Sequence, residues 1–197
     1  MPLPSPLWRS DQPAIVSAMS AKPRGVPPEL EEMIDSWAAI PAFIRDRYLT
    51  VVAANGLARS VSPSFHEGVN LVRSTFLDSD VLHTSPHPRL IAEHVAGTLR
   101  ESLSRHESDG DFEQIVEELS AASTQFAAAW NDEEAVPGEQ DTFTFPHDIV
   151  GALTLGYQQL SIPRHFDLTL VVWRPADEPS RTALAELAEI ASGASEA

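Results

Sequence analysis

The sequence has 197 residues, of which 43% are hydrophobic, and its formal net charge at pH 7 is −16. A chain of this length and apolar content can form one domain with its own core. The 29 acidic residues outnumber the 13 basic ones, which excludes the broad basic face of a typical duplex-binding protein. We therefore expect no direct DNA binding by this chain alone.

Cysteine is absent from the sequence, which excludes disulfides and thiolate metal sites. No apolar run is long enough to span a bilayer, and the N-terminus lacks the pattern of a secretion signal. Together these features favour a cytoplasmic protein that makes no contact with membranes.

The distribution of proline divides the chain into three parts. Residues 1–27 combine many prolines with serine and alanine, a composition typical of a flexible arm. Residues 28–192 carry the regular apolar patterns of a folded domain. Residues 193–197 are small and polar, and we expect a frayed tail there.

The first half of the domain predicts a helix, a hairpin and two short helices. Apolar residues at helical spacing, with Pro28 in the first turn, predict a helix to about residue 37. The segments 42–45 and 48–54 predict two strands joined by a turn at 46–47. Asn55 and Asn70 are suitable N-caps for the two helices that follow.

Longer helices are predicted in the middle of the chain. The span 88–105 has Leu90, Ile91, Val95, Leu99 and Leu103 at helical spacing, so we expect these residues on its buried side. Asp109 is a suitable cap for the next helix, which carries apolar residues from 112 to 119. A further helical segment spans 123–131. We expect the helices at 88–105 and 111–131 to lie over the sheet.

Three strands and a last helix complete the domain. β-Branched, aromatic and aliphatic residues alternate with period two within 142–145, 153–158 and 168–173, as in half-buried strands. Asp177, Glu178 and Pro179 then begin a helix. Five antiparallel strands with helices between the second and third are the layout of an α+β, PAS-like sheet covered by helices. Such a fold can leave a cavity between sheet and helices.

The candidate ligand-binding residues are apolar and aromatic side chains that we expect to face this space. For any single one of them, a place in the ordinary core is the alternative. Tyr157 adds a hydroxyl that could bind the polar end of a ligand. The full set is Trp37, Phe43, Phe76, Trp130, Leu153, Leu155, Tyr157 and Trp173.

No pattern predicts an enzyme. The sequence has no glycine-rich phosphate loop, no H-E-x-x-H and no G-x-S-x-G motif, so we expect no catalytic set, metal or cofactor. For His94 we favour a hydrogen-bonded or half-exposed side chain over a metal ligand. For His147, beside a strand, we favour a structural role in bonding the backbone.

Several segments, in their order and spacing, resemble one known family. They are PAFIRDRYLTVVAAN at 41–55, NLVRSTFLD at 70–78, FEQIVEELSAASTQFAAAW at 112–130, HDIVGALTLGYQQL at 147–160 and LTLVVWRPADEPSRTAL at 168–184. The chain resembles the ligand-binding (sensor) domain of MmyB-like (MltR-like) transcription regulators, a family common in actinobacteria. The departures include Ala54-Asn55 where the family has Trp-Asn.

The resemblance implies a PAS-like, non-enzymatic sensor that binds a small apolar molecule such as a fatty acid. Family members usually carry an N-terminal helix-turn-helix domain, and no such segment precedes the sensor in this sequence. The alternative is an interaction or dimerisation module that partners a DNA-binding regulator and has no ligand of its own. In either case a homodimer is the expected assembly.

Overall fold

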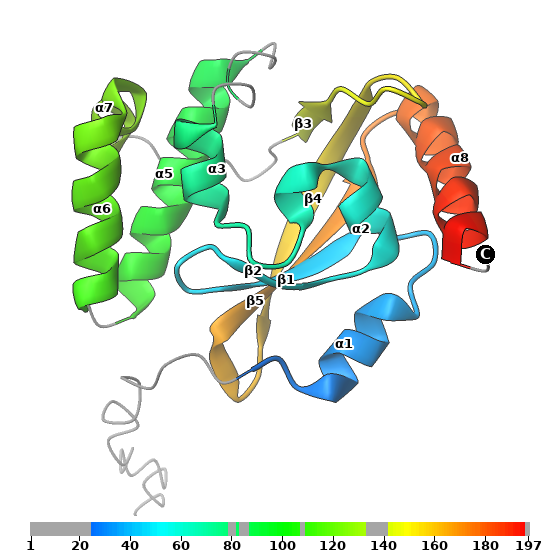
Figure 1. The fold of residues 1–197 in the computed structure, drawn as a ribbon, viewed down its shortest axis with the longest axis horizontal. Coiled ribbons are helices and arrows are strands. Elements are labelled where there is room, and N and C mark those ends of the chain that lie inside the picture. Colours follow the sequence, from blue (N-terminus) through cyan, green and yellow to red (C-terminus); the bar gives the residue numbers. More distant parts are fainter. Residues whose placement is uncertain (1–24, 79–81, 83–86, 107–108, 133–141, 196–197) are drawn as a thin grey trace, which may run out of the picture.

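The computed structural model describes residues 25–78, 82, 87–106, 109–132 and 142–195, and Figure 1 shows the fold. Residues 1–24 of the expected arm and residues 196–197 of the expected tail lie outside the described residues.

A five-stranded antiparallel sheet forms the centre of the domain (Figure 1). The strands are β1 (Ala42–Asp46), β2 (Val51–Ala54), β3 (Thr142–Phe145), β4 (Leu153–Ile162) and β5 (His165–Pro175). Their order across the sheet is β2-β1-β5-β4-β3, so the first and last strands in sequence pair at its centre. This arrangement confirms the expected α+β, PAS-like fold.

Three of the helices begin directly after capping residues that the sequence predicts. The described helices are α1 (Pro28–Asp35), α2 (Gly56–Val61), the 3₁₀ helix η2 (Pro63–Phe65), α3 (Leu71–Leu77), α5 (Pro88–Arg105), α6 (Gly110–Ala122), α7 (Thr124–Asn131) and α8 (Glu178–Ser195). The side chains of Asn55, Asn70 and Asp109 accept hydrogen bonds from the backbones of α2, α3 and α6. These three predicted caps are confirmed.

The turn of the first hairpin is longer than the sequence indicates. The Asp46 carboxylate accepts hydrogen bonds from the backbone N–H groups of Tyr48 (2.9 Å) and Thr50 (2.8 Å). Leu49 between them has φ of 65° and cannot continue a strand. We had expected the second strand to begin at Tyr48, but it begins at Val51.

The two faces of the sheet carry separate apolar clusters. Ala42 and Ile44 of β1 pack with Leu168 and Leu170 against α1, whose Ile34 is buried. The opposite face carries the alternate residues of the strands, which pack with α2, η2 and α8. Because neighbouring strand residues point to opposite faces, the alternation in β1 and β5 divides the core in this way.

A third cluster is formed by α3, α5, α6 and α7, which gather at one end of the sheet (Figure 1). We expected the segment 111–131 to lie over the sheet, but α6 and α7 pack mainly on α3 and α5. Leu90, which we expected on the buried side of α5, is exposed, whereas His94 and Thr98 of the same helix are buried. The reason is that α5 has two buried sides, one facing α7 and the other facing the sheet.

A polar network fixes this helical group to the first hairpin. Arg47 forms an ion pair with Asp109 at the start of α6, and the Tyr48 hydroxyl donates to the same carboxylate (2.7 Å). The Ser102 hydroxyl of α5 donates to the backbone carbonyl of Arg47 (2.6 Å). Tyr48 also packs on the ring of Phe112. These contacts hold α5 beside the sheet and so define one wall of a cavity.

Candidate ligand-binding site

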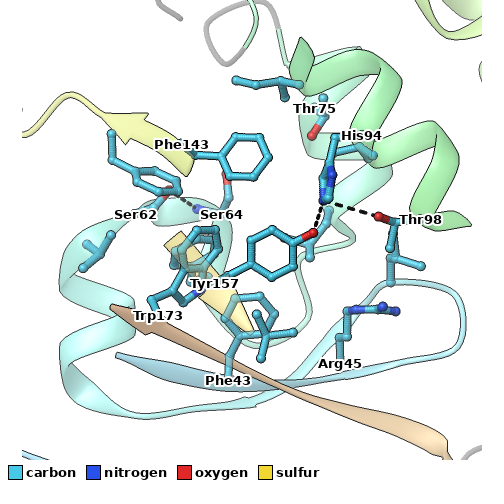
Figure 2. Close-up of a pocket in the computed structure, with 18 of the residues that line it drawn as sticks. Phe43, Arg45, Ser62, Ser64, Thr75, His94, Thr98, Phe143, Tyr157 and Trp173 are labelled. Carbon is cyan, nitrogen blue, oxygen red and sulfur yellow. Dashed lines mark hydrogen bonds between the residues drawn. The ribbon is translucent and has the colours of Figure 1, made fainter. Parts of the chain in front are cut away.

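A cavity of about 440 Å³ lies between the sheet, η2, α3 and α5 (Figure 2). Small-molecule sites commonly have volumes of roughly 300–1,000 Å³ and mostly apolar walls. This cavity is therefore large enough for a small organic ligand. The regular spacing of Ile91, Val95 and Thr98 along α5 brings one face of that helix to the cavity.

Aromatic rings form much of the wall. Trp173 of β5 contacts Phe65 (centroids 5.3 Å apart), Phe145 (5.2 Å) and Tyr157 (5.4 Å). Phe65 also contacts Phe43 of β1, with centroids 4.9 Å apart. Because these rings support one another in fixed positions, this part of the cavity is preformed and apolar.

A small polar group interrupts the apolar wall. The Tyr157 hydroxyl and His94 Nε2 are 2.9 Å apart, and the Thr98 hydroxyl lies 3.4 Å from the same nitrogen. The His94 ring also packs against Phe143, with centroids 5.0 Å apart. Figure 2 shows these side chains converging from α5 and from the strands. Hydroxyl and imidazole groups in this position can exchange hydrogen bonds with a ligand.

One arginine lies within this mostly apolar wall. Arg45 follows Phe43 by two positions in β1, so both side chains point to the cavity face of the sheet. Only 5% of Arg45 is exposed. Burial lowers its pKa to about 10, and Asp46, Glu101 and Tyr157 partly offset this effect. Arg45 therefore remains a cation at neutral pH.

The structure brings three of the eight predicted site residues to the cavity. They are Phe43, Tyr157 and Trp173. The other five have other surroundings, and none of them is among the described residues that line the cavity.

Each of these five residues packs in one of the core clusters. Trp37 follows α1 and packs on the opposite face of the sheet. Phe76 and Trp130 pack around Phe126 in the helical group. Leu153 and Leu155 lie on the same side of β4 as Tyr157, but they are fully buried in a cluster that includes Leu184 and Leu187 of α8.

Several lining residues were not predicted as site residues. Period two in β1 could have indicated Arg45, because Phe43 was already a candidate. Helical spacing in α5 relates Ile91 to His94, Val95 and Thr98, although the sequence does not tell which side of the helix faces the sheet. No sequence signal places the segment 62–68, which contains η2, at the cavity.

His147 has the structural role that we favoured. Its Nε2 lies 3.0 Å from the backbone carbonyl oxygen of Ser60, and its Nδ1 accepts a hydrogen bond from the backbone N–H of Ile149 (3.2 Å). The side chain thereby connects the segment before β4 to α2, and it does not line the cavity.

The described residues contain no cluster of three or more histidine, aspartate or glutamate side chains that could hold a metal ion. In the same part of the chain, no helix has the length and apolar character needed to cross a membrane.

A PAS-like sheet with a preformed, mostly apolar cavity beside it defines a ligand-binding domain. Residues 26–187 match the family model described as the MmyB-like transcription regulator ligand binding domain. The match covers most of the 197 residues, so the chain belongs to this family. No curated protein matches the sequence closely enough to count as a relative.

Proposed function

We propose that this domain is a non-enzymatic sensor that binds a small apolar molecule such as a fatty acid in the cavity. The observation that carries the proposal is the apolar cavity between the sheet and α5, with Phe43, Tyr157 and Trp173 in its wall. Family membership supports the ligand-binding role, because the family consists of ligand-binding domains of transcription regulators. The acidic charge of −16 supports a role that involves no direct contact with DNA.

A series of saturated fatty acids of increasing chain length tests this proposal. Each methylene group that enters the cavity contributes about 0.8 kcal/mol before ordering costs. We expect the melting temperature and the affinity to rise with chain length until the cavity is full. Native mass spectrometry of the protein purified from cells should show a retained organic molecule. No thermal shift with any chain length, together with an unliganded mass, would contradict the proposal.

A second candidate function is a dimerisation module, and two exposed side chains favour it. Leu160 is 49% exposed and Phe166 is 62% exposed, in the paired strands β4 and β5. Leu160 lies opposite Leu170, and Phe166 lies two positions before Leu168 on the same side of β5. Both side chains therefore extend the apolar surface of the face that α1 covers. Light scattering of the wild type and of Phe166→Glu tests this function. We expect a dimer for the wild type and a shift to the monomer for the variant.

A further inference from the structure

The surroundings of Arg45 indicate which kind of ligand the cavity selects. The guanidinium Nη2 donates a hydrogen bond to Gln159 Oε1 (2.6 Å), and Nη1 donates to the backbone carbonyl of Asp46 (3.4 Å). Both acceptors are neutral. Among the described residues, no carboxylate lies within 4.0 Å of this guanidinium. An arginine has five N–H donors, so several of them have no acceptor within that part of the chain.

A buried cation without an anionic partner is costly, and the cost is relieved when an anion reaches it. In the described lining, Arg45 is the one arginine or lysine, and it is a cation at neutral pH. Asp78, the acidic residue of the same lining, is exposed. One cation in an apolar wall fits a head group with a single negative charge better than a doubly charged phosphate.

The polar groups of His94, Thr98 and Tyr157 lie on the same side of the cavity as Arg45. Figure 2 shows Arg45 near Thr98, on the side away from Ser62 and below His94. The opposite part of the wall carries Trp173, whose ring contacts those of Phe65 and Phe145. Ser62 and Ser64 also lie there, but their hydroxyl groups form hydrogen bonds within the protein. The cavity thus has a cationic, hydrogen-bonding end and an aromatic end, which is the polarity of an amphiphilic molecule.

We propose that Arg45 binds the carboxylate of an apolar monocarboxylic acid whose hydrocarbon part lies against the aromatic rings. This inference rests on the proposed function and assigns the head-group site within the same cavity. Arg45 provides a charge-assisted, two-point contact that an uncharged head group cannot form. The cavity then discriminates between acids and their esters or alcohols of equal chain length.

Three probes with the same chain test the inference: decanoic acid, methyl decanoate and 1-decanol. Calorimetric titration of the full chain should show the acid binding about tenfold or more tightly than the ester and the alcohol. Arg45→Gln should remove this preference while leaving ester binding nearly unchanged, and Arg45→Lys should retain part of it. Arg174→Gln is the matched control, because Arg174 is an exposed arginine of β5 outside the lining, and it should behave as wild type.

The outcomes separate the two proposals. If all three probes bind the wild type equally, or if Arg45→Gln keeps the preference for the acid, the role of Arg45 is overturned and the apolar site stands. If none of the probes binds the wild type, the proposed function itself fails, and the role of Arg45 fails with it. Circular dichroism of each variant checks folding; should Arg45→Gln be unfolded, the wild-type comparison and Arg45→Lys decide the question.

Discussion

Asn55 joins three elements that are separate in the sequence, and it is only 2% exposed. Its side-chain oxygen accepts hydrogen bonds from the backbone N–H groups of Ala58 (2.9 Å) in α2 and Ala42 (3.2 Å) in β1. Its amide nitrogen donates to the backbone carbonyls of Ile34 (3.1 Å), Trp37 (3.2 Å) and Ile40 (2.8 Å). One side chain thus fixes the end of α1, the start of β1 and the start of α2.

Replacing this side chain should destabilise the whole domain. Asn55→Ala removes an N-cap, worth about 1 kcal/mol, and leaves several buried backbone groups without partners at about 1–3 kcal/mol each. We expect a loss of roughly 3 kcal/mol or more in the free energy of unfolding, measured by urea denaturation. The control is Asn131→Ala, an exposed residue whose loss should cost under about 0.5 kcal/mol. Equal effects of the two substitutions would contradict the role of Asn55.

Arg45 gives ligand binding a specific dependence on pH. Burial lowers its pKa to about 10; of the charged or titratable groups around it, Asp46, Glu101 and Tyr157 act to raise that pKa and Arg105 acts to lower it. Below pH 10 the guanidinium of the unliganded protein is protonated and can bind a carboxylate. As the pH rises through 10 it loses its proton, so the affinity for the anion should fall.

Binding of decanoic acid should therefore be constant from about pH 7 to 9 and weaken above about 10, whereas binding of methyl decanoate should not change with pH. Titration calorimetry across this range measures both. Tyr157→Phe removes another ionisable side chain that lines the cavity, besides those of His94 and Asp78, and the pH dependence should persist in that variant. A pH dependence that disappears with Tyr157→Phe would assign it to the tyrosine.

At the scale of single elements, the turn between β4 and β5 carries an unfavourable residue. Pro163 and Arg164 connect the two strands, and Arg164 has φ of 71°. Proline followed by a residue with positive φ is the pattern of a type II turn, in which glycine is preferred at the second position. An arginine there adopts a backbone conformation that costs roughly 1–2 kcal/mol for residues with a Cβ atom.

Arg164→Gly should therefore stabilise the domain by up to about 1 kcal/mol, after the greater chain entropy of glycine is deducted. The same substitution in a helix should act in the opposite direction. Arg181→Gly in α8 should destabilise by about 1 kcal/mol, because glycine is a poor helix former. Thermal unfolding of the two variants gives the sign of each change in stability. A lower melting temperature for Arg164→Gly would show that the positive φ of Arg164 does not destabilise the domain.

The elements were largely predictable because their signals are local. The caps Asn55, Asn70 and Asp109 and the alternation in β3 to β5 are properties of a few adjacent residues. The site was less predictable, because it depends on which helix covers which face. Trp37 is an aromatic residue of the type that lines apolar cavities, but it follows α1, which covers the other face of the sheet. Likewise, Leu155 shares a side of β4 with Tyr157, but α8 fills the space above it.

At the scale of the whole molecule, the cavity lies where two separately packed groups meet. The sheet with α2 and α8 forms one apolar cluster, and the helices α3, α5, α6 and α7 form another. The contacts of Arg47 and Tyr48 with Asp109 hold the groups together at the hairpin. Because each group has its own core, the space between them can accept a ligand without loss of either core.

Filling this space should abolish ligand binding without unfolding the domain. Val95 of α5 is partly buried and lines the cavity, so Val95→Trp places an indole where we expect the ligand. Overpacking should cost roughly 1–3 kcal/mol, which leaves a folded protein if the domain has ordinary stability. Decanoic acid should raise the melting temperature of the wild type and have little effect on the variant.

The matched control is Val116→Trp, which changes a partly buried valine of α6 that packs in the same helical cluster but does not line the cavity. This variant should suffer a similar loss of stability from overpacking and retain the thermal response to decanoic acid. The comparison separates occupation of the cavity from general damage to the core. If Val95→Trp responds to the acid as strongly as Val116→Trp and the wild type do, the ligand binds elsewhere on the domain, and the cavity at the junction of the two clusters is not its site.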